Sequence, residues 1–484
     1  MAAADRDLQA AIAVTRFGLG ARPGEIAAVR ADPRGWLKQQ IRRQGADQPQ
    51  GPDGPLPSMR ESYQIVADYK AGLKSISEAS RARGRRSLAT VRESGMAATQ
   101  TGAPREDIRA RREAIRPLRL AVASEMLSRV QLAAATTEGF RERWTLFWAN
   151  HFTVSRKSVL MTASVGPFER EAIRPHVFGR FGDLVAATSR HPAMLLYLDQ
   201  ARSVGPQSAI GRLRKAGLNE NLAREILELH TVGVDGGYTQ ADVTELARAL
   251  TGWTMGGANA GARTYSYLYR ADLHEPGPRR VMGRNYREGG DDQATAILAD
   301  LAAHPSAARH LARKLAIHFV SDEPPPALVS RLEATWTRSG GDLSAVANAL
   351  IEDPEAWVAP AAKLKTPYEF LVSSYRAADA VPADPNREVE VPLRTLGQRP
   401  FSAPQPDGWS DLASDWAAPD ALVKRLSWSR GFARRFSPQG APVEAARAVL
   451  GARLTSRTAT ALARAESRDE AFALFLMSPE FQRR

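Results

Sequence analysis

The run from Glu138 to His151 reads Glu-Gly-Phe-Arg-Glu-Arg-Trp-Thr-Leu-Phe-Trp-Ala-Asn-His, and it is the clearest helical pattern in the chain. Its aromatic side chains recur at the spacing of one helix face, with His151 at the end of that stripe. Helical periodicity continues from Leu118 to the middle of the chain and returns between Asp291 and Val320. The sequence therefore predicts a mainly α protein with a compact, multi-helix, bundle-like architecture.

Composition restricts the function classes. A chain of 484 residues with 43% hydrophobic content can bury a substantial core. The formal charge is +13, but the basic residues are dispersed and accompany no recognised motif, so we do not expect a nucleic-acid partner. The absence of cysteine excludes disulfides, thiolate metal sites and cysteine nucleophiles. No phosphate-binding loop or Gly-x-Ser-x-Gly motif occurs, which disfavours nucleotide-dependent reactions and serine hydrolysis of that type.

Three regions are expected along the chain: an N-terminal helical region (1–74), an exposed basic insertion without apolar periodicity (75–116), and a main helical domain (117–484). A phosphate-binding arm is the alternative interpretation of the insertion. Alternating aromatic residues followed by a Pro/Gly turn predict a small β-hairpin over 262–285. No stretch is long and apolar enough for a transmembrane segment, and the charged N-terminus lacks a signal peptide, which predicts a cytoplasmic location by default.

The segment from Asn219 to Trp253 predicts a helix-loop-helix, and its first helix carries the strongest chemical signal. Asn221, Glu225 and Glu228 fall on one side of that helix, and His230 lies where it should end. Two carboxylates, an amide and an imidazole within two turns are the groups that general acid–base chemistry needs. The alternative is that the glutamates pair with nearby arginines on a solvated face, where carboxylates need no function.

The second helix of this segment has a structural explanation. Thr239 stands three residues before Asp242, in the arrangement of a capping box, and the apolar residues that follow have the spacing of one buried face. Asp242 is therefore expected to cap the helix rather than to take part in chemistry.

Five motifs resemble the bacterial family catalogued as domain of unknown function 1800, and the resemblance covers essentially the whole chain. The motifs are Arg16–Glu25, Phe147–Phe152, Asn219–Trp253, Arg313–Phe319 and Ser478–Arg483. The resemblance implies a helical bacterial protein that is frequently encoded beside a secreted, sulfatase-like protein of an uncharacterised family numbered 1501. That neighbour is a possible partner, and it makes an envelope or periplasmic location an alternative. The run from Ala403 to Trp409 departs from the family pattern, in which similar proteins often have a lysine before the Gly-Trp pair.

The leading hypothesis is a hydrolase or lyase that acts on a glycan or an anionic envelope component. Its acid–base residues would be Glu225, Glu228, His230 and His151. Aromatic and polar side chains would contact the substrate. The candidates are Asn221, Tyr238, Trp148, Trp409, Trp416 and His274.

Two further hypotheses remain open. The protein could be a noncatalytic binding or assembly partner of the secreted neighbour, in which the central motif is a packed polar core. It could also be a His/Glu metalloprotein, although no short metal-binding signature occurs, so distant ligands would have to converge. The candidates for holding a divalent metal are His151, His230, His274 and His318. No other cofactor is required by the sequence.

Overall fold

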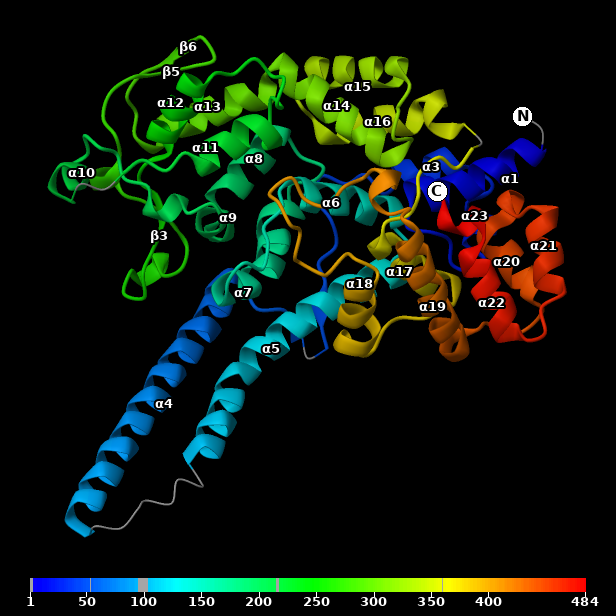
Figure 1. The fold of residues 1–484 in the computed structure, drawn as a ribbon. Coiled ribbons are helices and arrows are strands. Elements are labelled where there is room, and N and C mark those ends of the chain that lie inside the picture. The colour runs from blue at the N-terminus through cyan, green and yellow to red at the C-terminus, as the bar shows by residue number, and fades with distance from the viewer. Residues whose placement is uncertain (1–2, 53, 95–102, 215–216, 359) are drawn as a thin grey trace.

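The computed structural model describes residues 3–52, 54–94, 103–214, 217–358 and 360–484. The prediction of a mainly α protein is confirmed, since the described residues form 23 α-helices, several short π and 3-10 turns, and three two-stranded antiparallel sheets. Figure 1 shows a body from which one long helical hairpin projects. None of the helices in the described parts of the chain combines the length and apolar character needed to cross a lipid bilayer.

The helices of the body follow one another with short connections. In the first half they are α1 (Ala3–Ile12), α2 (Glu25–Val29), α3 (Pro33–Lys38), α6 (Gly139–His151), α7 (Val159–Phe168), α8 (Phe181–Arg190), α9 (Pro192–Tyr197), α10 (Ala209–Arg214), α11 (Asn221–Glu225) and α12 (Gln240–Leu250). In the second half they are α13 (Asp291–Ala303), α14 (Pro305–Phe319), α15 (Pro326–Ser339), α16 (Leu343–Glu352), α17 (Pro367–Ala377), α18 (Val391–Thr395), α19 (Pro419–Phe436), α20 (Pro442–Leu450), α21 (Ser456–Ala463), α22 (Arg468–Met477) and α23 (Pro479–Gln482). Four π-helical turns interrupt or extend them: η1 (Ala13–Phe17), η2 (Glu169–Ile173), η4 (Ile226–His230) and η8 (Pro385–Glu390).

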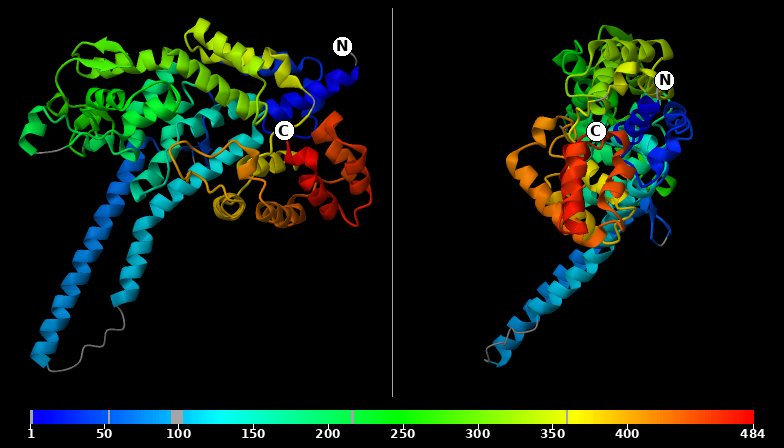
Figure 2. Two further views of the ribbon diagram at one scale, coloured as in Figure 1. Left: turned by 45° about the horizontal axis from the view of Figure 1, so that its top comes forward. Right: turned by 90° about the vertical axis from the view of Figure 1, so that its right-hand side faces the viewer.

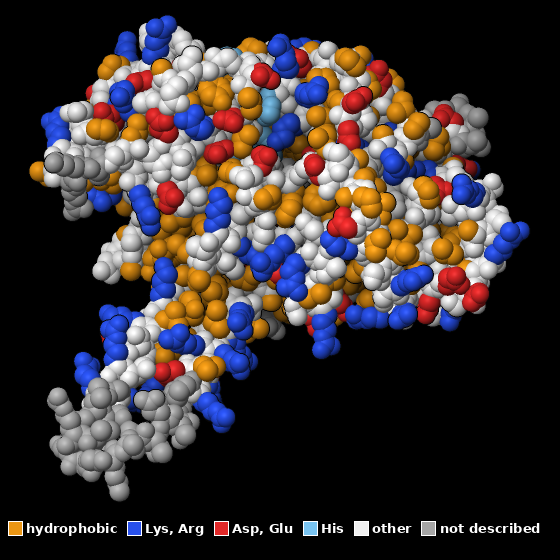
Figure 3. All heavy atoms as spheres, in the orientation of Figure 1, with side chains coloured by type: hydrophobic (Ala, Val, Ile, Leu, Met, Phe, Trp, Pro, Cys, Tyr) orange, Lys and Arg blue, Asp and Glu red, His pale blue; other side chains and the backbone are white. Residues whose placement is uncertain are grey.

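The projecting hairpin, here called the arm, consists of α4 (Met59–Ser94) and α5 (Ala103–Ala135). Its two helices run side by side away from the body in all three views (Figures 1 and 2). Of the insertion expected over 75–116, residues 75–94 and 103–116 form the outer part of this hairpin, and residues 95–102 lie outside the described residues. Lys and Arg side chains line the arm in Figure 3, in keeping with the exposed arginines of both helices. The inner half of α5 continues into the body, where it packs against α7 and α17.

Two hydrophobic cores fill the body. The larger core surrounds α6 and contains Trp144, Trp148 and Trp336, all of which are buried. The smaller core lies among the inner half of α5, α17 and the C-terminal helices, and it includes Phe370. Phe401 packs against both cores. The loop that carries Phe401 therefore lies where the two cores meet.

Helix α6 is more deeply buried than a single aromatic stripe predicts. The predicted stripe is indeed buried, but the charged residues on the opposite side are buried as well. Glu142 pairs with Arg174, and Arg143 pairs with Glu369. Buried charges persist in proteins only when they are paired and hydrogen-bonded, so α6 is a central helix that organises ion pairs as well as the core.

The strand pairing differs from the predicted single hairpin over 262–285. Strand β4 (Tyr267–Tyr269) pairs with β3 (Trp253–Met255), while β5 (Arg279–Val281) pairs with β6 (Arg284–Tyr286). The turn between β5 and β6 places Met282 and Gly283 at φ angles of 47° and 79°, the left-handed region that two-residue hairpin turns require. The region thus forms two small ladders rather than one. The third pair, β1 (Gln50–Gly51) with β2 (Gly54–Pro55), lies near the N-terminus.

Candidate functional site

The predicted acid–base residues lie on α11 and the π-helical turn η4, here called the η4 region (residues 221–230). Glu225 and Glu228 are half-buried, and the hydroxyl of Tyr238 donates to Oε2 of Glu228 at 3.2 Å. Glu225 accepts no hydrogen bond from any described residue. Burial raises the pKa of Glu225, and the carboxylates of Glu228 and Asp407 raise it further. Single π-helical turns occur often at functional sites, so the η4 region stays a candidate for function.

The expected pairing of Glu228 with an arginine one turn earlier is not formed. Arg224 instead pairs with Glu220 at 3.2 Å and also donates to Gln240. The capping interpretation of the second helix is confirmed, because Thr239 and Asp242 form a reciprocal capping box at the start of α12. The other carboxylate oxygen of Asp242 accepts the backbone N–H of Met282, which ties this cap to the β5–β6 ladder.

His230 is buried among aromatic rings rather than presented to a substrate. Its ring lies 5.0 Å from Phe152 and 6.0 Å from His151, centroid to centroid. Neither ring nitrogen has a hydrogen-bond partner in the described part of the chain. Burial, together with the nearby charge of Lys314, lowers the pKa of His230 to about 3. The imidazole is therefore neutral at physiological pH and behaves as part of the core.

His151 is held by two partners. Its Nε2 lies 3.2 Å from the carbonyl oxygen of His230, so Nε2 carries the proton and donates it to this carbonyl. Its Nδ1 then accepts a hydrogen bond from Nζ of Lys314 at 3.1 Å. Burial lowers the pKa of His151 well below its usual value, and the charge of Lys314 acts in the same direction. Both nitrogens of this histidine are thus occupied.

His310, Lys314 and His318 recur every four residues along α14 and lie on one side of that helix. Nε2 of His310 lies 3.2 Å from the carbonyl oxygen of Leu229, and Nδ1 of His318 lies 2.7 Å from Oδ1 of Asp411. Lys314 forms no ion pair within 4 Å among the described residues. Burial lowers the pKa of Lys314, while the more distant Asp411 and Asp407 offset part of that effect.

The four histidines proposed as metal ligands do not all converge. His151 and His230 are neighbours, and His318 lies nearby, across Phe147 from His151. His274 is elsewhere, beside Tyr269, with Nδ1 at 2.9 Å from the carbonyl oxygen of Thr251. Within the described residues, no group of three or more His, Asp and Glu side chains is placed to hold a metal ion. The four histidines of the metalloprotein hypothesis therefore do not form one preformed metal site in the described part of the chain.

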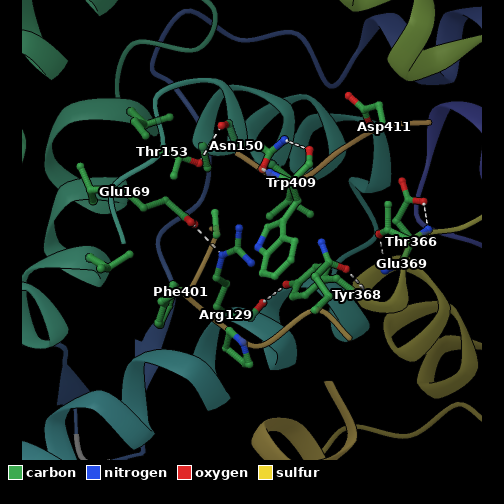
Figure 4. A pocket seen from close by; sticks show the side chains of 18 of the residues that line it. Arg129, Asn150, Thr153, Glu169, Thr366, Tyr368, Glu369, Phe401, Trp409 and Asp411 are labelled. Atoms are coloured by element: carbon green, nitrogen blue, oxygen red, sulfur yellow. Dashed lines mark hydrogen bonds and ion pairs between the residues drawn. The ribbon is translucent and has the colours of Figure 1, made fainter. Parts of the chain in front are cut away.

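A cavity of about 130 Å³ lies where the two cores meet (Figure 4). Helices α5, α6 and α17, the turn η2 and the loop 398–412, here called the Trp409 loop, form its walls. Its size is similar to that of an engineered cavity that holds one benzene ring, about 150 Å³. The side chains that give it chemical character are Arg129, Asn150, His318, Tyr368, Phe401 and Trp409.

The Trp409 loop is fastened to α6 by one side chain. Nδ2 of Asn150 donates to the carbonyl oxygen of Trp409, and Oδ1 of Asn150 accepts the backbone N–H of Trp409, both at 2.8 Å. Gly408 has a φ of +87°, and a Cβ there would come within 2.4 Å of the Asn150 carbonyl oxygen. This close approach turns the indole of Trp409 into the cavity, beside Arg129 and Tyr368 (Figure 4).

His318 and Asp411 form an oriented pair at the cavity wall. Because a carboxylate oxygen can only accept, Nδ1 of His318 carries the proton of this 2.7 Å hydrogen bond. Nε2 is buried and has no hydrogen-bond partner within the described residues. Burial lowers the pKa of His318, although Asp411 partly opposes this effect. At neutral pH the ring is therefore a neutral imidazole whose free lone pair is on Nε2, the form in which histidine acts as a base.

Several predicted substrate contacts are not available to a substrate. Trp148 is fully buried in the larger core, so its side chain is not placed to contact a substrate as predicted. Trp416 is also buried, packs against Trp409, and donates its Nε1 hydrogen to the carbonyl oxygen of Ser410. Asn221 is exposed at the start of α11, away from the cavity walls. Of the residues predicted for the site, Trp409 and His318 line the cavity.

Sequence reasoning missed Arg129, Asn150, Tyr368 and Asp411. Asn150 stands beside His151 in the quoted Phe-Trp-Ala-Asn-His-Phe motif, so a polar residue next to the expected site was visible there. The other three come from an arginine-rich helix, a distant helix and a loop. No local pattern distinguishes them from the neighbouring residues.

Comparison with known proteins identifies a family but no individual relative. No curated protein and no solved structure matches the chain. A family model described as "Protein of unknown function (DUF1800)" matches residues 12–483, which is nearly the whole sequence. The chain belongs to the DUF1800 family.

Proposed function

We propose that this protein is a hydrolase or lyase that acts on a glycan, with the cavity as its substrate site and His318 as its acid–base residue. The observation that carries the proposal is the 2.7 Å hydrogen bond between Asp411 and His318, two residues of the cavity lining, which leaves Nε2 of the imidazole without a partner among the described residues. Because this nitrogen is enclosed, the His318 ring or the Trp409 loop must shift to bring it to a ligand. In hydrolytic enzymes a carboxylate on one imidazole nitrogen fixes the tautomer and leaves the other nitrogen to move a proton.

The walls of the cavity suit a sugar ring. Tyr368, Phe401 and Trp409 supply aromatic faces, and Asn150 and Tyr368 supply polar atoms among them. Ligand sites commonly combine apolar and aromatic walls with a few placed polar groups of this kind. A volume of about 130 Å³ is close to that of one six-membered ring, so one sugar ring would fill the cavity and the rest of a glycan would lie outside it.

The proposed acid–base residue differs from those that the sequence favoured, which were Glu225, Glu228, His230 and His151. His151 has both nitrogens occupied, and His230 is enclosed by aromatic rings. Glu225 and Glu228 do not line the cavity. Their role as acid–base residues stays a prediction that the variants described below compare directly with His318.

A second role, as a binding or assembly partner, is favoured by the arm. An arm of two long helices that bears exposed arginines, among them Arg109 and Arg112, offers a surface for an acidic partner outside the body. Such attachment is compatible with catalysis in the cavity. It would fit the proposed assembly with a secreted sulfatase-like neighbour, and it would place the protein in the cell envelope.

The test of the proposed enzyme is cleavage of a panel of neutral and acidic oligosaccharides, followed by mass spectrometry and by the appearance of new reducing ends. His318→Gln should lower the rate at least about 100-fold, the usual contribution of a positioned acid–base group. Asp411→Asn should also lower the rate, because the amide no longer fixes the tautomer that leaves Nε2 free.

His176→Gln is the matched control, since this half-buried histidine lies outside the cavity and should leave the rate unchanged. A folded His318→Gln variant with the full rate would overturn the assignment of the acid–base residue. A folded wild-type protein that cleaves no member of the panel would overturn the proposed function.

A further inference from the structure

Arg129 brings unused hydrogen-bond donors into the cavity. Its Nε donates to Oε2 of Glu169 at 2.7 Å, while its two terminal nitrogens donate to no described residue. The guanidinium carbon lies 4.8 Å from the centroid of the Tyr368 ring and 5.9 Å from that of Phe401. The side chain is 20% exposed. A guanidinium held in this way presents a planar fork of donors, the geometry that matches a carboxylate.

The surrounding ion pairs leave these donors available. Glu169 is already shared between Arg129 and Arg174, and Arg174 also holds Glu142. Burial tends to raise the pKa of Glu169, but the two arginines outweigh it and keep this pKa below its usual value. Glu169 therefore stays ionised and anchors Arg129 through Nε. The two terminal nitrogens are left without an acceptor among the described residues.

Cations outnumber carboxylates at two other places near the cavity. Glu369 pairs with two arginines, and so does Glu390. Arg399, one of the partners of Glu390, is itself part of the cavity lining. In the cavity lining itself, three arginines face three carboxylates, Glu169, Glu369 and Asp411. An anionic ligand would therefore be held by the free donors of Arg129 rather than by a net positive charge. The aromatic faces fit one ring of a ligand, and the free guanidinium nitrogens of Arg129 fit one carboxylate on that ligand.

We propose that the sugar bound in the cavity is a 4-linked uronate, with its carboxylate on the terminal nitrogens of Arg129 and its ring against Tyr368 and Trp409, and that the reaction is an elimination. This inference rests on the proposed function of the cavity. It selects a lyase over a hydrolase and an acidic sugar over a neutral one.

The chemistry follows from the residues around the ring. Charge neutralisation of the carboxylate by Arg129 makes the hydrogen on the adjacent carbon, C5, easier to remove. Once a shift of the His318 ring or of the Trp409 loop uncovers Nε2, its lone pair takes that proton, and the electron pair of the C5–H bond becomes the second bond between C4 and C5. The C4–O bond to the neighbouring sugar breaks, and its oxygen takes a proton from the Tyr368 hydroxyl. Water is not consumed, and solvent returns both side chains to their starting states.

Tyr368 is suited to donate that proton. Burial raises its pKa, with the nearby carboxylates of Glu142 and Glu169 adding to the effect, while Arg129 opposes it, so the phenol is protonated at neutral pH. Its hydroxyl makes one long hydrogen bond, 3.4 Å to the backbone carbonyl oxygen of Arg129. Such a weak bond leaves the hydroxyl free to turn toward a ligand.

The decisive experiment offers the protein 4-linked oligomers of galacturonate, glucuronate, mannuronate and guluronate, each beside its carboxyl-reduced neutral counterpart. Cleavage is followed in water enriched in oxygen-18 by ultraviolet absorbance and mass spectrometry. The proposal expects an absorbing unsaturated uronate end, no oxygen-18 in the product, and no cleavage of the reduced oligomers. Cleavage with oxygen-18 and without new absorbance would overturn the elimination but leave a hydrolase in the cavity. Equal cleavage of reduced oligomers would overturn recognition of the carboxylate.

Binding measurements test recognition of the uronate carboxylate separately from cleavage. Saturation-transfer NMR with the four monomeric uronates should detect binding of at least one, and Arg129→Lys should weaken it at least 10-fold because an ammonium cannot offer the same fork. Arg119→Lys, on the exposed part of the same helix, is the matched control and should bind normally. If Arg129→Lys fails to fold, Tyr368→Phe serves as the second variant, and it should keep uronate binding while losing most of the elimination rate. Wild-type protein that binds and cleaves no uronate, yet cleaves neutral oligosaccharides, would overturn this inference alone.

Discussion

The cavity and the η4 region both combine carboxylates with histidine, but they differ in how those groups are paired. In the cavity, Asp411 holds one nitrogen of His318 and leaves the other free, and Glu169 anchors Arg129 while leaving its outer donors free. In the η4 region, Glu225 accepts no hydrogen bond from the described residues, and neither nitrogen of His230 has a partner among them. Reactive residue types therefore lie close together in both regions, but only those of the cavity are partly paired and line an open volume.

The largest expected difference between the two regions concerns stability. Arg174→Met removes a wholly buried cation that holds Glu142 and Glu169 behind the cavity, and it should cost roughly 3–5 kcal/mol of unfolding free energy. His230→Leu removes an imidazole without hydrogen bonds and keeps the volume similar, so it should cost less than about 1.5 kcal/mol.

Urea unfolding monitored by circular dichroism measures both changes. Arg447→Met breaks only an exposed pair with Glu444 and should stay below about 1 kcal/mol. If Arg174→Met and His230→Leu lowered the free energy of unfolding equally, pairing would not distinguish the two regions.

The second difference concerns the rate of oligosaccharide cleavage. Glu225→Gln and Glu228→Gln should stay within a few-fold of the wild-type rate, whereas His318→Gln should lose at least about 100-fold, equivalent to about 2.7 kcal/mol in the activation free energy. The rates are measured on the most rapidly cleaved oligosaccharide at saturating concentration. The opposite ranking would return the reacting centre to the η4 region.

The third difference concerns two amide side chains. Asn150→Ala removes both hydrogen bonds that fasten the Trp409 loop, and the loss should be about 1–3 kcal/mol in the local opening free energy. Hydrogen exchange of residues 398–412 measures it, and exchange should become faster. Asn221→Ala is the counterpart in the η4 region, where the exposed side chain makes no hydrogen bond to a described residue. Unchanged exchange in Asn150→Ala would show that the loop is held by its other contacts.

The smallest difference is a pH dependence carried by the neutral histidines around η4. Burial lowers the pKa of His230 to about 3 and that of His310 to about 4, with Lys314 acting in the same direction. The unfolded chain takes up protons at these sites near pH 6.5, before the folded chain does, so stability should fall as pH decreases from about 6.5. Each such histidine contributes at most about 1.4 kcal/mol per pH unit. His230→Leu should flatten the slope of unfolding free energy between pH 6 and pH 4, and an unaltered slope would contradict the assignment.

The helical architecture could be predicted from the sequence because the periodic spacing that indicates a helix involves residues close together in the chain. The aromatic stripe of α6 and the Thr239–Asp242 cap both depend on residues within a few turns of each other. The strand pairing could not be predicted in the same way. The partner of Tyr267–Tyr269 is Trp253–Met255, which follows directly after a helix and gives no alternating signal of its own.

The cavity could not be predicted because its chemistry depends on distant segments. His318 was identified as a candidate ligand, but Asp411, which gives it a defined tautomer, lies 93 residues further along the chain. Arg129 is one of many arginines, and only its position beside Tyr368 and Glu169 sets it apart. Sequence patterns identified reactive residue types, whereas their pairing depends on how helices far apart in the chain meet.

Helix α5 belongs to the arm at one end and to the cavity at the other, so the two are mechanically connected. Its 33 residues correspond to a rod of about 50 Å, with Arg129 near the anchored end and the arm as the long end. Pro117 lies inside this helix, between the outer arm and Arg129, and is the position at which the helix can bend. A partner that docks on the arm would therefore contact the same helix that carries Arg129 into the cavity.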